Sequence, residues 1–252
     1  MEKRGLSILA LAILVGMVVG AFILGKSIER FKTDDRYISV KGFSEREVKA
    51  DLAIWPLKIR MAVGDIQTGS KSMESARVKV IEFLTKNGIN PEEIIRKNLT
   101  VVDKQAREYE SANDRTGLRY ILEETVEVRS NNVDQIQKVS RMTSDLLNAG
   151  VVLSSGPEWG GSDLKFIYTQ LNSIKPDMLA EATVNAQKAA EQFAKNSNTG
   201  LGKMRKANQG LFTIMDRDIS LSQSSGENYN PGSSSDITKN VRVVISVEYA
   251  IR

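Results

Sequence analysis

The sequence predicts an α+β protein, with an N-terminal transmembrane helix followed by a mostly antiparallel sheet packed with about three helices. Three observations lead to this prediction. An uncharged apolar run fills residues 6–25, several segments alternate between polar and apolar residues, and three segments carry apolar residues at helical spacing. Successive strand candidates joined by short polar connections imply hairpins, and hairpins imply antiparallel pairing.

The apolar run reads LSILALAILVGMVVGAFILG. As a helix it would be about 30 Å long, which is the thickness of the hydrocarbon core of a bilayer. A cleaved signal peptide is the alternative, but its apolar core usually has about 7–15 residues and ends at a small-x-small site. Here Phe22, Ile23 and Leu24 continue the run. We therefore expect a transmembrane anchor or uncleaved signal, and either alternative sends the rest of the chain across a membrane.

Basic residues flank this run on both sides, so charge alone does not decide its orientation. Gly16 and Gly20 form a GxxxG pattern, a candidate site for helix packing in the membrane. The predicted organisation is a cytoplasmic N-terminus at residues 1–5, the anchor at 6–25, a charged tether at 26–36, and a domain at 37–252 that contains a flexible loop at 216–239.

Strand candidates share alternating polarity or a run of β-branched residues. They cover Tyr37–Lys41, Leu52–Val63, Ile95–Lys104, Leu118–Arg129, Leu164–Tyr168, residues 203–215 and Val241–Ile251. Gly42 is predicted to end the first of these strands. The strands at 95–104 and 118–129 are predicted to form a hairpin.

Three amphipathic helices are predicted between these strands. Asp65 is expected to cap the first, which Asn87-Gly88 ends, and Asn90-Pro91 opens one further capped turn. The second lies between Asn132 and Gly150. The third covers residues 175–195, and its predicted apolar face is Met178, Leu179, Ala182, Ala186, Ala189 and Phe193. The order strand–strand–helix occurs near 37–88 and again near 95–150, which suggests an internal pseudo-repeat.

The composition excludes several kinds of chemistry. The chain has no histidine and no cysteine, which removes Ser-His-Asp and Cys-His catalysis, disulfides and the usual zinc sites. Its net charge is +4, but basic and acidic residues are interleaved, so nucleic acid is not an expected partner. We expect no enzyme, no catalytic residue, no cofactor and no metal site.

Two features could still carry function. Glu124 falls on the apolar face of its strand, where a carboxylate needs a partner or a raised pKa. A structural ion pair or an exposed strand end is the interpretation we prefer to catalysis. Trp159, Gly160 and Gly161 form a candidate partner-binding loop, and a loop tucked against the core by its tryptophan is the alternative.

Four stretches of the chain carry a family resemblance. They are ISVKGFSEREVKADLAIWPLKI, LRYILEETVEVRSNNVDQIQKV, KPDMLAEATVNAQKAAEQFAKNSNTGLGKM and VRVVISVEYAI. In this order and spacing they resemble the SIMPL-domain family of bacterial envelope proteins. The resemblance implies an α+β domain outside the cytoplasmic membrane, with the N-terminus inside. It also implies links to oxidative stress defence and to ring- or channel-like homo-oligomers, and it carries no catalytic motif.

Two functions are therefore expected as alternatives. The first is a single-pass protein of the bacterial inner membrane whose periplasmic domain acts non-enzymatically through homo-oligomeric assembly, at strand edges expected at Tyr37–Lys41 and Val241–Ile251. The second is a periplasmic module that binds a ligand or an unidentified envelope partner through the loops around Trp159 and 216–239. The bilayer and a second copy of the chain are the partners of the first.

Overall fold

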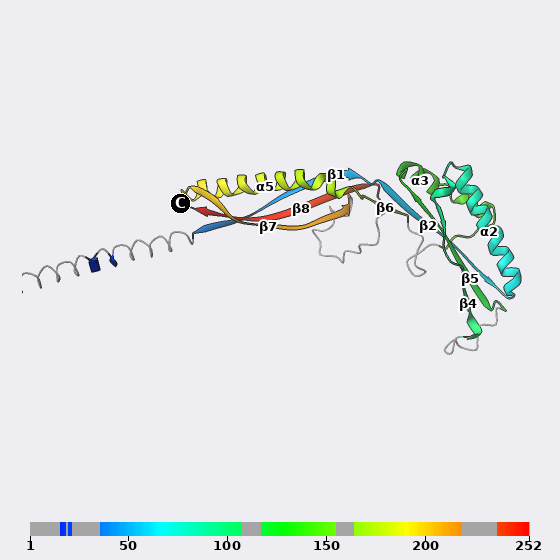
Figure 1. Ribbon diagram of the computed structural model, residues 1–252. Helices are drawn as coiled ribbons and strands as arrows, with labels where there is room; N and C mark the ends of the chain where they lie inside the picture. Colours follow the sequence, from blue (N-terminus) through cyan, green and yellow to red (C-terminus); the bar gives the residue numbers. More distant parts are fainter. Residues whose placement is uncertain are drawn as a thin grey trace, which may run out of the picture. The chain divides into compact units, whose positions relative to one another are not determined.

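The computed structural model describes residues 16–18, 20–21, 36–106, 117–154, 164–217 and 236–251 (Figure 1). The chain divides into two compact units. Unit 1 comprises Met1–Glu45, Lys175–Thr213 and Arg242–Arg252, and unit 2 comprises Arg46–Ile174 and Ile214–Val241.

The described elements confirm an α+β fold with antiparallel strands, arranged in two sheets. In chain order they are β1 (Tyr37–Lys49), β2 (Leu52–Val63), α2 (Ile66–Lys86), a 3₁₀ turn (Pro91–Glu93), β3 (Ile94–Arg96), β4 (Thr100–Asp103), a 3₁₀ turn (Lys104–Ala106), β5 (Tyr120–Ser130), α3 (Val133–Ser140), α4 (Ser144–Asn148), β6 (Lys165–Ile167), α5 (Leu171–Asn196), β7 (Leu201–Asp216) and β8 (Thr238–Ile251).

The five-stranded sheet has the order β3-β5-β2-β6, with β4 also pairing with β5. Its centre is the antiparallel ladder of β2 and β5, which runs from Ala53 opposite Ser130 to Val63 opposite Tyr120. The predicted alternation is confirmed, because every second residue is buried from Ala53 to Ile59 and from Leu122 to Ser130, on the side where the helices pack. The core of unit 2 includes Trp55, Leu57, Ile59, Met73, Val80, Leu84, Leu122, Val126, Val128, Ile136, Leu146 and Phe166.

The predicted ends of α2 are confirmed. The Asp65 carboxylate accepts a hydrogen bond from the Thr68 N–H at 2.8 Å, which satisfies a donor that the first helical turn leaves unpaired. Gly88 has φ of +82°, a left-handed conformation that glycine adopts without strain. Asn90 opens the short turn that follows as a capping box with Glu93.

Two predicted elements are broken in the structure. The predicted strand at 95–104 divides into β3 and β4, since the three residues Lys97–Leu99 face only Glu124 and Thr125 of β5. This is a bulge, with one extra residue on one strand. The predicted helix between Asn132 and Gly150 divides into α3 and α4, where the Ser140 and Thr143 hydroxyls donate to carbonyls three residues earlier.

The three-stranded sheet has the order β1-β8-β7, and this order corrects two predictions. Val241–Ile251 lies in β8, the central strand, and is therefore not an edge. Strand β1 does not end at Gly42 but continues to Lys49. Strands β1 and β8 are antiparallel, because the Ala50 N–H donates to the Ile237 carbonyl near one end and the Ile251 N–H to the Arg36 carbonyl at the other.

The pseudo-repeat is not a structural repeat. Its first half is split between the sheets, since β1 pairs with β8 in one sheet and β2 with β5 and β6 in the other. In its second half, β3 and β4 both pair with β5 in the same sheet. A similar order of elements therefore does not produce a similar arrangement of strands.

Helix α5 lies along the three-stranded sheet (Figure 1), and most of the residues that it buries are small. Its buried residues recur every four positions: Met178, Ala182, Ala186, Ala190 and Ala194. We call the last four the alanine stripe. The predicted apolar face was wrong at Phe193, whose side chain is 57% exposed. Ala189 and Leu179 are partly buried, and the fully buried position beside Ala189 is Ala190, which the prediction did not include.

Gly42 explains why this face is made of alanine. A Cβ atom added to Gly42 would lie 2.1 Å from the Ala182 carbonyl oxygen and 2.7 Å from the Ala186 Cβ. The backbones of β1 and α5 thus approach so closely that no side chain fits between them at this point. This explains why a glycine stands inside a strand, where it is otherwise unfavourable.

We predict that Gly42→Ala lowers the free energy of unfolding by about 3 kcal/mol, because the added methyl group meets helix backbone that cannot move aside without disturbing the whole contact. Denaturant unfolding followed by circular dichroism measures this. Ser39→Ala, at an exposed position of the same strand, is the control and should change stability by less than about 0.5 kcal/mol. Equal stability of the two variants would contradict the close contact.

Candidate functional site

Strand β7 is the most unusual surface of unit 1. It has sixteen residues and lies at an edge of its sheet, with β8 as its only neighbour among the described strands. Residues 203–211 are exposed without a break, so both faces of this part of the strand meet solvent. Leu211 is 89% exposed. An edge strand of this length presents unpaired N–H and C=O groups that can pair with another chain.

Charge divides the exposed part of β7 into two segments. Lys203, Arg205 and Lys206 lie in its first part, where charged side chains discourage pairing with another strand. The following residues, Ala207–Thr213, read ANQGLFT and carry no charge. We call this the open edge segment. It lacks charged residues and proline, two of the features that usually protect an edge.

Close backbone contacts hold β7 against β8. A Cβ added to Gly202 would lie 2.8 Å from the Ala250 carbonyl oxygen, and one added to Gly210 would lie 2.6 Å from that of Val244. The Lys175 ammonium lies 5.8 Å from the centre of the Phe212 ring, a cation–π contact between α5 and β7. The strand is therefore anchored to β8 along one side, and no described strand pairs with its other side.

The predicted loop at 216–239 begins and ends at a buried ion pair. The Lys239 ammonium donates to the Asp216 carboxylate, and both side chains are buried. The second Asp216 oxygen accepts from the Asp236 N–H at 3.4 Å, and the Arg217 N–H donates to the Thr238 carbonyl. Residues 218–235 lie outside the described part of the chain. The described ends are thus fixed to each other independently of the segment between them.

The other predicted site residues divide between described and undescribed parts of the chain. Gly16 and Gly20 are helical, and apart from their own helix backbone and chain neighbours no described atom comes within 4 Å of a Cβ built on either. The rest of the predicted anchor at 6–25, apart from residues 17, 18 and 21, lies outside the described residues. No helix in the described part is long and apolar enough to cross a membrane. Trp159, Gly160 and Gly161 also lie outside the described residues.

Glu124 has the partner that its position on an apolar face requires. Its carboxylate is 3% exposed and accepts from the Arg77 guanidinium of α2 at 3.2 and 3.4 Å. Arg77 also pairs with Glu74. Burial lowers the pKa of Arg77, but its hydrogen bonds to Glu74 and Glu124 outweigh this, so its pKa lies above the ordinary value. The geometry is that of an ion pair which attaches α2 to the sheet.

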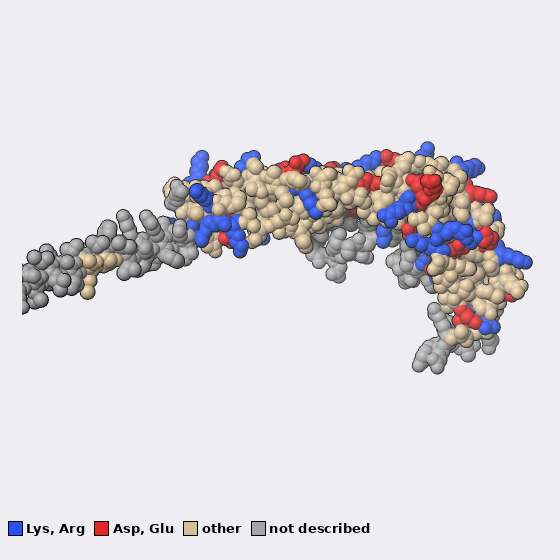
Figure 2. All heavy atoms as spheres, viewed as in Figure 1, with Lys and Arg blue, Asp and Glu red and all other residues tan. Residues whose placement is uncertain are grey.

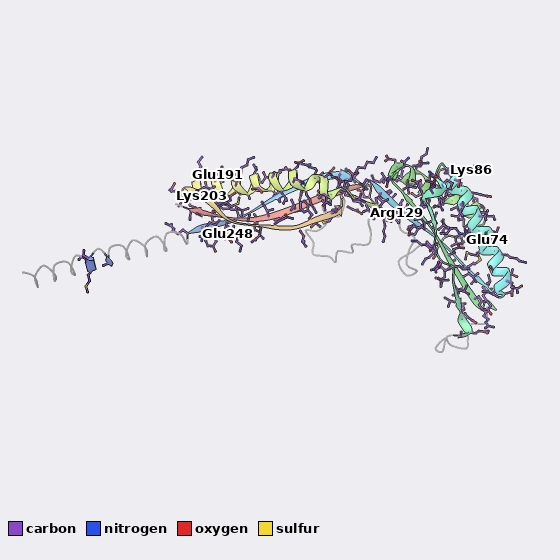
Figure 3. The ribbon with its side chains drawn as sticks, viewed as in Figure 1. Glu74, Lys86, Arg129, Glu191, Lys203 and Glu248 are labelled. Atoms are coloured by element: carbon purple, nitrogen blue, oxygen red, sulfur yellow. The ribbon has the colours of Figure 1, made fainter. Side chains whose placement is uncertain are left out.

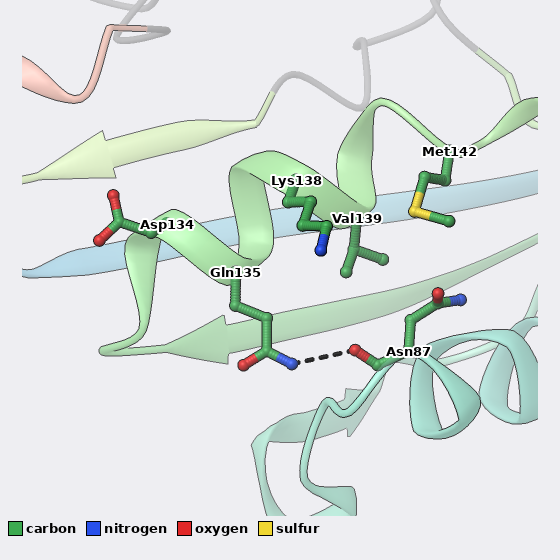
Figure 4. Close-up of a pocket in the computed structure, with 6 residues that line it drawn as sticks. All are labelled: Asn87, Asp134, Gln135, Lys138, Val139 and Met142. Atoms are coloured by element: carbon green, nitrogen blue, oxygen red, sulfur yellow. Dashed lines mark hydrogen bonds between the residues drawn. The ribbon is translucent and has the colours of Figure 1, made fainter.

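Two hollows of unit 2 could receive a ligand. One, of about 400 Å³, is lined by Asn87, Asp134, Gln135, Lys138, Val139 and Met142 (Figure 4). Its Gln135 amide donates to the Asn87 carbonyl at 2.9 Å, and Asp134 pairs with Lys49, so two of its polar side chains already hold structure together. The other, of about 590 Å³, is lined by apolar residues that include Trp55, Leu57 and Leu164, and by Ser140, Thr143 and Ser144.

We predict that Glu124→Gln lowers the free energy of unfolding by about 2 kcal/mol, because it removes a charged partner from Arg77, whose side chain is 13% exposed. Glu123→Gln is the matched control. It lies on the opposite face and pairs with Lys58 at 2.9 Å, where screening by solvent limits the loss to below about 1 kcal/mol. Denaturant titration compares them, and an unchanged midpoint for Glu124→Gln would rule out a structural role for this carboxylate.

The comparisons with known proteins agree with the family resemblance of the sequence. No curated protein matches this chain. Residues 38–249 match the SIMPL family, described as a protein of unknown function, DUF541. The match begins at the second residue of β1 and ends near the end of β8, so it spans both units. The chain therefore belongs to the SIMPL (DUF541) family.

Proposed function

We propose that this protein is a membrane-anchored, extracytoplasmic envelope protein that acts without catalysis, by assembling with further copies of itself. The observation that carries the proposal is the open edge segment Ala207–Thr213 of β7, an uncharged part of an edge strand with both faces exposed for most of its length. In a second copy, a strand laid along this edge would supply the missing hydrogen-bond partners.

The two edges of the three-stranded sheet are different, which limits the assemblies that can form. Pairing of β7 with β7 of a second copy gives a two-fold dimer. Pairing of β7 with β1 of the next copy is a head-to-tail contact, which continues until it closes as a ring or forms a filament. The mass of the assembly distinguishes these arrangements, and both of them use β7.

The membrane part of the proposal rests on the apolar run at residues 6–25 and on the family to which the chain belongs. We place the anchor in a bacterial inner membrane and residues 37–252 in the periplasm, where a link to envelope or oxidative stress would act. The absence of catalysis is supported by the lack of histidine and cysteine and by the engagement of Glu124 with Arg77. Resistance of the full chain to extraction from membranes at high pH tests the anchor.

A single substitution tests the assembly. We predict that Leu211→Lys converts the assembled protein to monomers, because it places a charge on the open edge segment while removing a side chain that is almost fully exposed in the single chain. Light scattering and native mass spectrometry of the full chain in detergent measure the mass. Phe193→Lys, at an exposed position of α5 in the same unit, is the control and should leave the mass unchanged.

Three outcomes would contradict this assignment. A wild-type chain that is monomeric at all concentrations would remove assembly as the function. An assembled Leu211→Lys variant of unchanged mass would show that β7 is not the contact. Loss of assembly in both variants would show that the effect of the added charge is not specific to the edge.

The second candidate function is a module that binds a partner through the loops around Trp159 and 216–239. One observation favours it: Leu153 and Leu164, which flank the segment containing Trp159, line the hollow of about 590 Å³. Because Asp216 and Lys239 fix the ends of the second loop, we predict that deleting residues 220–236 changes Tm by less than about 2 °C and abolishes capture of an envelope component. Unchanged capture would exclude the loop as a binding element.

A further inference from the structure

One end of the three-stranded sheet gathers basic side chains from β7, from the last turn of α5 and from the residue before β1. The Arg36 carbonyl accepts from the Ile251 N–H at 3.1 Å, which places the start of β1 beside the end of β8. Gly202 of β7 lies against Ala250. The Arg205 guanidinium lies 5.5 Å from the centre of the Tyr37 ring. The start of β1, the end of β8 and the start of β7 therefore meet at this end of unit 1.

We call these residues the basic end: Arg36, Lys195, Lys203, Arg205 and Lys206, of which Lys195 lies in the last turn of α5. All five side chains are exposed. Glu191 and Glu248, labelled with Lys203 in Figure 3, are acidic residues of the same unit among those that the structure describes. Figure 2 shows Lys and Arg side chains clustered over this end.

The position of the basic end in the chain indicates what it faces. Arg36 is the first described residue of the domain, and residues 26–35 separate it from the end of the apolar run at Gly25. A fully extended segment of this length reaches at most about 35 Å. If residues 6–25 span a bilayer, the basic end is the part of the three-stranded sheet nearest in the chain to the membrane surface, and it is held within reach of it.

We propose that the basic end binds the anionic headgroups of the membrane in which the chain is anchored. This proposal rests on the anchor in the proposed function but not on the assembly. Near an anionic surface each Lys or Arg strengthens binding by about fivefold, and the effect extends over about one Debye length, close to 8 Å at physiological salt. The anionic headgroups thereby hold the three-stranded sheet with its basic end toward the lipid.

A fluorescent label on a single cysteine tests this in the full chain, because the protein has no cysteine of its own. Ser197→Cys lies in the exposed connection between α5 and β7, next to the basic end. Ala180→Cys is the control, exposed on the same helix and about 25 Å away along its axis. Each labelled chain is reconstituted into vesicles of phosphatidylcholine with or without phosphatidylglycerol, both carrying a nitroxide quencher on a headgroup.

We expect the Ser197→Cys label to be quenched in anionic vesicles, much less in neutral ones, and not in 1 M salt, where the Debye length falls to about 3 Å. The label at position 180 should respond to neither lipid. Lys203→Gln with Lys206→Gln should lower the ratio of bound to unbound domain by roughly 25-fold. Lys71→Gln with Lys86→Gln, which changes the net charge equally at exposed positions of α2, should leave it unchanged.

The experiment distinguishes a wrong assignment of the membrane anchor from a wrong assignment of the headgroup contact. A chain that separates from the vesicles on flotation in high salt would show that residues 6–25 do not anchor it. A chain that floats with the vesicles, but whose label at position 197 is quenched equally in neutral and anionic lipid, would overturn the headgroup contact alone. If the two double lysine variants lowered the ratio of bound to unbound domain equally, the headgroup contact would be overturned as well. The attraction to the lipid would then depend on the net charge of the chain and not on the basic end.

Discussion

The close approach of α5 to β1 at Gly42 is the contact on which the rest of unit 1 depends. A helix can lie this near to a strand only where neither presents a side chain larger than a methyl group, and here glycine faces the alanine stripe. Because the stripe is narrow, α5 buries few atoms per residue. Helix α5 therefore stabilises the sheet through close contact along the alanine stripe. Any added side-chain volume in this contact would disturb it.

This narrow contact also explains why β7 is open. The buried residues of β1 and β8 alternate along the strands, as expected for a sheet with one face covered by a helix. Residues 203–211 of β7 show no such alternation, because α5 does not cover them. Unit 2 is built differently, with large apolar side chains between its sheet and helices. The edge that we propose for assembly thus follows from how little of its sheet one helix can cover.

Local features of the fold could be predicted from the sequence and distant ones could not. The bounds of β2 are those expected, and Asp65 and Gly88 end α2 as expected, because alternation and caps are read from neighbouring residues. The place of Val241–Ile251 at the centre of its sheet depends on β1 and β7, which are far away in the chain. The regular burial of every second residue in that strand is nevertheless typical of a strand with neighbours on both sides. The exposed residues of β7 show no alternation, and the sequence signal that could have identified this edge is the lack of alternating polarity in KMRKANQG.

For individual residues, too, the local requirement could be predicted from the sequence but the distant partner could not. That Glu124 needs a partner could be predicted from its place on an apolar face, but that Arg77 supplies the charge depends on how α2 lies on the sheet. Gly42 was misread as the end of a strand, since a glycine inside a strand has the same local signature whether the chain turns or a helix backbone comes close. The two cases differ only in the residues that lie against the glycine, and here these are Ala182 and Ala186, well over a hundred residues away in the sequence.

Amide hydrogen exchange of the full chain, compared between dilute and concentrated protein, tests the central claim most directly. If β7 is the contact between copies, peptides covering Ala207–Thr213 exchange slowly in the concentrated sample and rapidly in the dilute one, while peptides of β8 exchange slowly in both. If the 207–213 peptides exchange equally fast at both concentrations while the protein is assembled, another surface joins the copies and the account of β7 is wrong.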